Sequence, residues 1–526
     1  MVRQGSPDPS RINRRTFLRG AAGTAGGFGI LGLAACGSSG SSQSGASGTP
    51  KRGGVIEFAV GSTLVNETVD PANTLDANED LITAALYEKL CEMDTKWTAQ
   101  PKLATSWHPN TALTEWTFLI RDNVHFHDGQ LFTARDAAYS LRRLLNPKLG
   151  SILQPAWSRI LDPDGIIAPD ARTLILKLKQ PSGMPPILLS YRGSEIVPED
   201  SGPYLAKRAN GTGPFKLSSF VAGQSWEVVR NPHYWMTGLP YLDGIRETAA
   251  TDPAAKVQAV LSGTADVTDT IDPALAKTVV GNPTASLIRD HGRIEMFIVT
   301  DVRHKPFDDN RVRTAMKLAM DRQAIAKTAL QGYAIQTSDT VVPQYDPFCP
   351  PNLGIRKRNV EQAKQLLSEA GYPNGIDVEL NCANIIGGMV DMDTAISQTV
   401  AEAGIHLNIK QTPAESYYVQ VWRQVPIFND WIVHRHPAVR LPLTFTSNAI
   451  WPESHYPNTP LDGMQEEINL KPDDPTVYAA PLTWISNNEG YYNPAFADGL
   501  TVRKNRVHDL RIRTAGDYDY QYAWVS

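Results

Sequence analysis

Segments with the hydrophobic pattern of strands alternate along most of this chain with segments that have the pattern of helices. Strand-like apolar runs occupy 54–60, 116–120, 173–178, 375–380 and 405–409. Apolar residues recur with helical spacing between these runs, at 79–90, 133–145, 309–319, 359–370 and 392–403. Interleaving of this kind predicts an α/β protein built on mixed sheets.

Several of the predicted helices carry a start signal. Thr133 is followed three residues later by Asp136, and Asp309, Asp321 and Asn359 each precede a helical segment. Side-chain oxygens at this position accept hydrogen bonds from the first free backbone N–H groups of a helix. A further strand is predicted at 124–127, before a turn at Asp128-Gly129.

The first 36 residues predict an export and lipidation signal rather than part of the fold. Asn13 to Arg19 (NRRTFLR) has a twin-arginine pattern, and the apolar stretch 20–35 is too short to span a bilayer comfortably. Cys36 follows Leu-Ala-Ala, which resembles the bacterial lipobox, so Cys36 is predicted to carry a lipid. The Gly/Ser-rich residues 37–50 then predict a flexible tether. We expect a protein anchored at the outer face of the cytoplasmic membrane, in the periplasmic space of the cell envelope.

Charge, cysteine spacing and the lack of catalytic motifs exclude several classes of function. Lys plus Arg total 50 and Asp plus Glu total 55, so the net charge of −5 gives no reason to expect a nucleic-acid partner. The spacing of Cys91, Cys349 and Cys382 does not suggest a zinc site. A disulfide between Cys349 and Cys382 is possible, because the predicted compartment permits one. The sequence contains no GxSxG, HExxH or P-loop pattern, so we expect neither an enzyme nor a cofactor.

Short motifs spread over about 400 residues together resemble the family 5 extracellular solute-binding proteins. In order, they are LYEKL (86–90), PKLATSW (101–107), FHDG with TARD (126–129, 133–136), GTGPF with RNPHYW (211–215, 230–235), FDDNRVR with AMDR (307–313, 319–322) and AK…LLSEAGY (363–372). That family comprises the dipeptide, oligopeptide and nickel-type receptors of ABC importers.

The resemblance implies a two-lobed periplasmic-binding-protein-like fold (type II, cluster C). Lobe I would comprise 51–298 plus 480–526, with an inserted subdomain at 79–200, and lobe II would comprise 299–479. The lobes would close around a peptide or peptide-like solute, and ABC permease subunits would recognise the closed form. The resemblance implies a monomer without a cofactor.

The resemblance also implies the binding residues. Peptide-binding members meet the ammonium of the peptide with an Asp three residues after a Trp. Here Trp431 fits, but His434 occupies the position of the acid, and Arg435 adds positive charge. The residues expected to bind the solute are Ser62, Thr63, Leu64, Trp431, Val433 and His434.

Several alternatives stay open. His434 and His436 are two apart and would face one side of a strand, which suits a nickel or other metal chelate as the solute. The replaced acid also permits an anionic or blocked peptide, or a sugar. An exported hydrolase, an adhesin and a signalling receptor on the same fold are further possibilities. Near the C-terminus, Pro472 and Pro475 are expected to interrupt a long helix of the family.

Overall fold

The computed structural model describes residues 48–61, 67–74, 77–206, 208–512 and 518–526. The predicted lipidation site Cys36 and the predicted ligand loop Ser62, Thr63 and Leu64 lie outside these residues. The signal segment 1–36 and most of the tether lie outside them as well.

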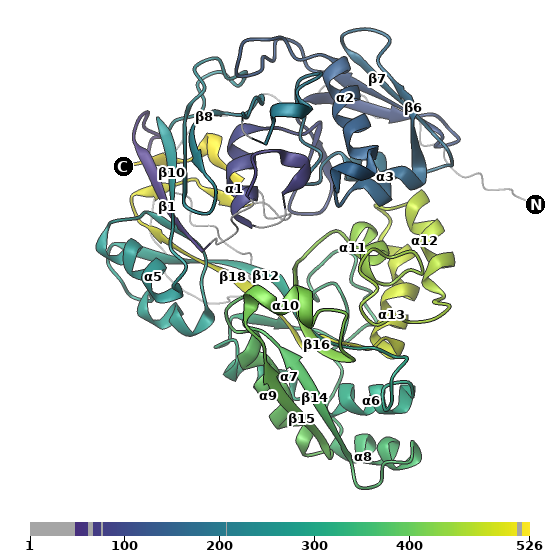
Figure 1. Ribbon diagram of the computed structural model, residues 1–526. Coiled ribbons are helices and arrows are strands. Elements are labelled where there is room, and N and C mark those ends of the chain that lie inside the picture. Colours follow the sequence, from purple (N-terminus) through teal and green to yellow (C-terminus); the bar gives the residue numbers. More distant parts are fainter. Residues whose placement is uncertain (1–47, 62–66, 75–76, 207, 513–517) are drawn as a thin grey trace, which may run out of the picture. The chain divides into compact units, whose positions relative to one another are not determined.

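Most strands belong to one mixed sheet (Figure 1), which has twelve strands in the described part of the chain. Ten of them follow one another in the spatial order β15 (Ile405–Gln411), β14 (Ile376–Cys382), β16 (Ile427–Val433), β12 (Ala285–Thr300), β18 (Ala495–Lys504), β11 (Val267–Thr270), β1 (Val55–Val60), β10 (Gly244–Ala249), β9 (Ser225–Arg230) and β8 (Phe215–Val221). The short strands β13 (Ala334–Gln336) and β17 (Tyr491–Tyr492) pair with β18 and β12. Parallel and antiparallel pairs both occur, as the interleaved pattern predicted.

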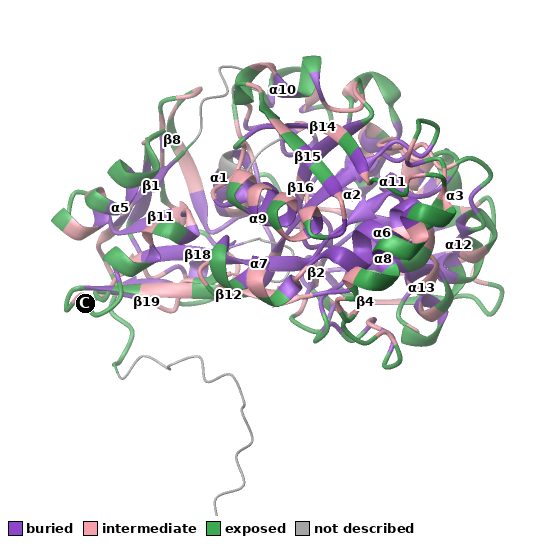
Figure 2. Cartoon of the chain, turned by 90° about the horizontal axis from the view of Figure 1, so that it is seen from below, coloured by how far each residue is buried: buried purple, intermediate pink, exposed green. Residues whose placement is uncertain are grey.

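The long strand β12 joins the two ends of this sheet. Its residues 285–290, 294 and 295 pair with β18, and its residues 294–300 pair with β16 on the other side. The register shifts between Asp290 and Ile294, and a bulge of this kind bends a strand. The second half of β12 and most of β18 are buried, which Figure 2 shows along the middle of the sheet.

A separate four-stranded antiparallel sheet lies within the segment that was predicted as an inserted subdomain. Its order is β4 (Ala104–Pro109), β5 (Glu115–Ile120), β7 (Thr173–Leu178) and β6 (Leu161–Ile167). Three two-stranded sheets pair β2 (Cys91–Met93) with β3 (Ala99–Pro101), β19 (Val507–His508) with β22 (Trp524–Val525), and β20 (Arg511–Ile512) with β21 (Tyr518–Asp519).

The α-helices occupy the remaining helical segments. Their bounds are α1 (Ala77–Leu86), α2 (Ala134–Leu145), α3 (Gln154–Ile160), α4 (Pro185–Leu188), α5 (Pro253–Ser262), α6 (Asn310–Ala319), α7 (Arg322–Thr328), α8 (Val360–Glu369), α9 (Met389–Ala401), α10 (Ala414–Gln420), α11 (Pro437–Thr444), α12 (Leu461–Leu470) and α13 (Ala479–Asn488).

The predicted start signals are confirmed. Thr133 and Asp136 form a reciprocal capping box at α2, and the side chains of Asp309, Asp321 and Asn359 cap α6, α7 and α8. The strand predicted at 124–127 is wrong. This segment makes a single bridge, between His125 and Leu131, because the backbone folds back at once through the turn that follows it.

One apolar core joins segments that are distant in the sequence. It combines buried side chains of the 90–196 segment, such as Trp157 and Leu188, with buried side chains of the 417–491 segment, such as Leu443 and Tyr478. The backbone N–H of Gly183 donates to the carbonyl oxygen of Asn469 over 2.7 Å. These contacts fix α3 and α4 against α11 and α12, and the candidate site lies between them.

The interruption expected near Pro472 and Pro475 is confirmed. Helix α12 ends at Leu470, and a short 3-10 turn at Pro475–Tyr478 leads into α13. The hydroxyl of Tyr478 donates to the carbonyl oxygen of Pro472 over 2.6 Å, which holds the turn between the two helices.

Candidate ligand-binding site

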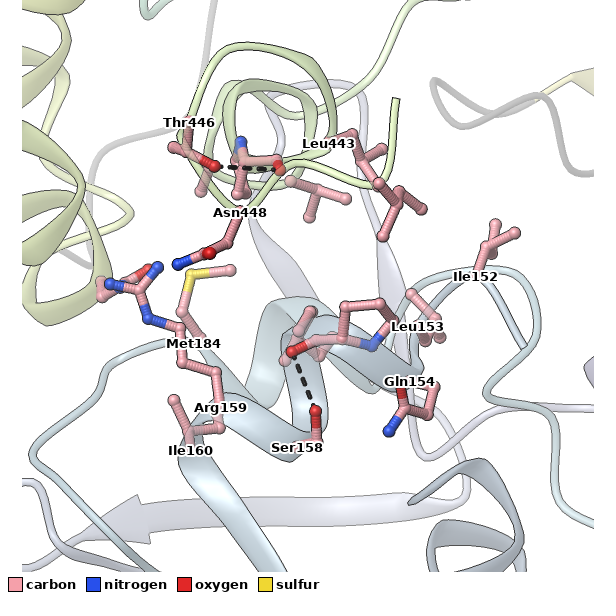
Figure 3. A pocket seen from close by; sticks show the side chains of 18 of the residues that line it. Ile152, Leu153, Gln154, Ser158, Arg159, Ile160, Met184, Leu443, Thr446 and Asn448 are labelled. Carbon is pink, nitrogen blue, oxygen red and sulfur yellow. Dashed lines mark hydrogen bonds between the residues drawn. The ribbon is translucent and has the colours of Figure 1, made fainter. Parts of the chain in front are cut away.

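A cavity of about 610 Å³ lies between two parts of the chain that are far apart in the sequence. One wall consists of residues 152–160, which include α3, with Met184, Leu188 and Tyr191 around α4. The other wall consists of residues from 435–450 and from α12. Figure 3 shows Ile152 to Ile160 and Met184 facing Leu443, Thr446 and Asn448. Cavities that hold small molecules in proteins measure about 300–1,000 Å³, so this cavity is large enough for a solute.

The lining of the cavity is largely apolar. Buried apolar side chains on its walls are Leu153, Ile160, Met184, Leu188, Ala438, Val439 and Leu443. Several charged side chains of the lining are exposed, namely Arg159, Asp462 and Glu466. An apolar interior with few polar groups is the usual composition of a ligand pocket.

Arg435 is the buried charged residue of this lining. Its side chain belongs to a residue that is only 7% exposed, and it forms no hydrogen bond or ion pair with any described residue. Burial is the main cause that lowers the pKa of its guanidinium to about 10, so the group is still charged at neutral pH. The guanidinium carbon lies 5.6 Å from the ring centroid of Trp451.

The backbone on both sides of Arg435 is fixed. The N–H of His434 donates to the carbonyl oxygen of Arg293 over 2.7 Å, which continues the pairing of β16 with β12 by one residue. His436 caps α11, because its Nδ1 accepts a hydrogen bond from the N–H of Ala438 over 3.1 Å. Pro437 occupies the first turn of α11, where a missing N–H costs nothing. Arg435 therefore stands at a rigid junction between strand and helix.

The predicted ligand residues Trp431 and Val433 lie in β16, opposite Met296 and Ile294 of β12. Both are partly exposed. Neither residue lines the cavity, although both lie within four residues of Arg435. Their part in binding stays a prediction.

His434, the third predicted ligand residue in this stretch, is buried beside an acid. Its Nε2 lies 3.1 Å from Oδ2 of Asp346, although the two groups are not aligned as a hydrogen bond. The indole N–H of Trp97 donates to the same oxygen over 2.9 Å. Trp97 comes from the 79–200 segment, so this cluster links the two sides of the cavity-bearing region. His434 does not line the cavity either, and its role in binding stays a prediction.

The two histidines do not form a metal site of the protein. Nδ1 of His436 is occupied by the cap of α11, and burial lowers the pKa of this imidazole to about 3. Among the described residues, no group of three or more His, Cys, Asp or Glu side chains is arranged to hold a metal ion.

The disulfide considered between Cys349 and Cys382 is wrong. In the described part of the chain Cys91, Cys349 and Cys382 are all free thiols. Cys382 is the last residue of β14 and is buried there, whereas Cys349 lies in the connection after β13. Burial raises the pKa of both thiols, to about 12 and about 11, so neither is a reactive thiolate.

Sequence reasoning missed most of the cavity. Arg435 was noticed only as a positive charge near His434, and the residues of α3, α4 and α12 carried no signal of their own. The available sign was the charged Arg435 two residues after a mostly apolar strand.

Among the described residues, none of the helices combines the length and the apolar character needed to cross a bilayer.

Comparison with curated proteins finds a partial match to binding proteins. The chain is 27% identical over 335 residues to the glutathione-binding protein GsiB of Salmonella typhi, which covers 62% of this chain. The match spans 63% of the length of GsiB, which is less than two thirds of that protein.

Comparison with solved structures establishes the fold. The periplasmic binding protein DppA of Helicobacter pylori, in complex with the peptide STSA, has a TM-score of 0.78 at 19% identity, over 90% of this chain and 98% of DppA. NikA of Staphylococcus aureus, in complex with Ni(L-His)2, has a TM-score of 0.76 at 18% identity, over 90% of this chain and all of NikA. These likenesses confirm the predicted two-lobed periplasmic-binding-protein-like α/β fold.

The family itself is shown by its sequence profile. The profile of the bacterial extracellular solute-binding proteins, family 5 (middle region), matches residues 98–445, which is well over half of the chain. This region contains one wall of the cavity and the part of the other wall up to Leu443. The chain therefore belongs to the bacterial extracellular solute-binding proteins of family 5.

Proposed function

We propose that this protein is the extracytoplasmic solute-binding component of an ABC importer. It captures a peptide or peptide-like solute between two lobes and delivers it to the permease subunits. The observation that carries this proposal is the cavity whose walls come from 152–191 and from 435–469. A ligand that contacts both walls stabilises the closed arrangement of the two segments, which is how a binding protein signals that it is loaded.

Family membership and the relatives support this function. GsiB is named as a glutathione-binding protein, and the structure of DppA holds a short peptide. We propose the lobe limits 51–298 with 480–526, and 299–479, with the inserted subdomain at 79–200. The chain acts as a monomer that binds its solute without catalysing a reaction.

The binding residues proposed from the sequence complete the site. Ser62, Thr63 and Leu64 contribute from the residues that follow β1 in the sequence, and Trp431, Val433 and His434 contribute from the end of β16 and the residue after it.

A metal chelate is the second candidate for the solute. The rings of His434 and His436 both face Trp97, with centroid distances of 5.1 and 5.9 Å, so two imidazoles lie close together near the cavity. The structure of NikA holds nickel with histidine. Metal analysis of the protein as purified separates this candidate from a metal-free peptide.

Native mass spectrometry tests the proposed function. The protein is purified from its own host without denaturant, and the bound solute is released and identified. We expect one solute per chain, and we expect that adding it back to stripped protein raises the melting temperature, because a ligand that binds only the folded state stabilises it. The proposal is contradicted if no solute is released and neither a panel of short peptides nor nickel with histidine shifts the melting temperature.

We also propose that the protein is exported by its twin-arginine signal and held at the outer face of the cytoplasmic membrane by a lipid on Cys36. The mature N-terminus of protein from native membranes should be Cys36 with its acyl chains, and Cys36→Ala should release the protein from the membrane. Membrane retention of the Cys36→Ala variant would contradict the anchor, but it would leave solute binding untouched.

A further inference from the structure

Arg435 carries a charge that no described residue neutralises. The residue is 93% buried, its Nη1 has no acceptor among the described residues, and it lines the cavity. A charged group taken out of water is costly unless it is paired and hydrogen-bonded. Such a group facing a cavity indicates that its partner arrives with the ligand.

Other deeply buried arginines of the described chain have partners. Arg440 bonds to Glu295 with Nε and Nη2, each over 3.2 Å. The guanidinium of Arg322 forms an ion pair with Asp339 at 2.5 Å, and that of Arg313 donates to the carbonyl oxygens of Phe307 and Asn488. Arg435 differs from these three, so its lack of a partner is not a general property of buried arginines in this fold.

The neighbours of Arg435 do not supply the missing anion. Tyr191 and Asp80 are near enough to favour its charged form, but a tyrosine hydroxyl is not an anion at neutral pH and Asp80 is already ion-paired with Arg192. Arg192 and Arg440 are near enough to disfavour it. Trp451 contributes the face of its indole ring, which carries no charge. None of these described neighbours therefore offers Arg435 an unpaired carboxylate.

We propose that Arg435 binds a carboxylate of the solute, which makes the solute an acid with an apolar or peptidyl body. A guanidinium matches a carboxylate through two parallel N–H···O bonds, and removal from water strengthens this pairing. The cavity beyond Arg435 is lined by the apolar side chains of Met184, Leu188, Val439 and Leu443, which suits the rest of such a solute. This assignment rests on the proposed function and adds the chemical group that is recognised.

Apolar tripeptides, each made with a free and with an amidated C-terminus, are the probe. Their affinity is measured by titration calorimetry for the wild-type protein, for Arg435→Met and for the control Arg172→Gln, which changes an exposed arginine that does not line the cavity. We expect wild type and Arg172→Gln to bind the free acids. We expect amidation or Arg435→Met to weaken binding by about 30-fold or more, which is the usual loss when one partner of a buried charge pair is removed. The melting temperature of Arg435→Met without solute should equal or exceed that of wild type, which separates lost binding from lost folding.

Two results would overturn the role of Arg435. One is equal binding of acid and amide by wild type, and the other is binding by Arg435→Met that matches wild type. If wild type binds none of the tripeptides, the test passes to the solute that is released from the native protein. A released solute without a carboxylate overturns the assignment of Arg435. The proposed function stands in that case. If no solute is released and no probe binds, the proposed function itself fails.

Discussion

The segment 435–446 carries two buried arginines, one just before α11 and one within it, and among the described residues only Arg440 has a carboxylate partner. Arg440 faces the sheet, where its guanidinium meets Glu295 and the side chain of Thr444, and Tyr491 donates to the same carboxylate over 2.7 Å. Burial alone would lower the pKa of Arg440, but Glu295 holds it above its usual value. Arg435 lines the cavity, and burial lowers its pKa. We infer from this difference that Arg440 serves stability and that Arg435 serves the ligand.

The largest effect is expected on the sheet side. Arg440→Met should lower the free energy of unfolding by about 3–5 kcal/mol, because it leaves the carboxylate of Glu295 buried without its cation. Denaturant unfolding measures this. Changing Glu295→Met in the same chain should recover most of the loss, since the pair is then removed as a whole. A single variant as stable as wild type would mean that the ion pair contributes nothing.

His436 lies between the two arginines in the sequence, and its protonation would add a third buried positive charge. The pH dependence of the free energy of unfolding shows how much that charge destabilises the fold. Its folded-state pKa is about 3 against an ordinary value of 6.5, so below pH 6.5 the unfolded chain takes up a proton that the folded chain refuses. Stability should therefore fall as the pH drops from 6.5 toward 3, by up to about 1.4 kcal/mol per pH unit from this group. Unfolding curves of wild type and of His436→Asn are compared over this pH range. The asparagine keeps a capping oxygen but does not titrate, so the difference between the two proteins is the contribution of His436. Equal pH dependence of the two proteins would show that His436 is protonated freely.

A smaller and opposite effect is expected on the cavity side. Arg435→Met without solute should leave the free energy of unfolding unchanged or raise it by about 1 kcal/mol, because a costly unpaired charge is replaced by an apolar side chain of similar length. The same denaturant unfolding used for Arg440→Met makes the two values comparable. A loss as large as that of Arg440→Met would show that Arg435 has a structural partner, and the contrast between the two sides would disappear.

The smallest effect is expected at Trp431, which lies just before this segment and does not line the cavity. Trp431→Ala should weaken solute binding several-fold and leave the protein folded, because the indole is partly exposed. Trp484→Ala, a partly exposed tryptophan of α13, is the control. Unchanged affinity of Trp431→Ala would remove this residue from the site.

Local signals in the sequence predicted most of the fold. The capping residues Thr133, Asp309, Asp321 and Asn359 act over two or three residues, so the helix starts followed from their neighbours alone. The segment 124–127 looked like a strand, but Phe126 bonds to the adjoining turn and His127 donates to the distant Gly211, which short-range patterns do not reveal. The order of strands in the large sheet was not predicted, because the spacing of residues does not show which strands pair.

The candidate site was predicted only in part, because it is made by contacts over long distances in the chain. Leu188 and Leu443 line the same cavity although about 250 residues separate them in the sequence. Neither residue carries a local sequence signal of this role. The sequence places Arg435 near the binding region, but its burial and its missing partner depend on how α4 and α11 pack. The replaced acid at His434 was visible in the sequence, whereas the contact of its imidazole with Asp346 was not.

The most direct test is a crystal structure of the protein in complex with the solute that was released from it and added back. It shows where the ligand lies. We expect the solute inside the cavity between α3 and α11, with a carboxylate about 3 Å from the guanidinium nitrogens of Arg435. A solute bound elsewhere, or one in the cavity that leaves Arg435 without an anion, would contradict this binding mode.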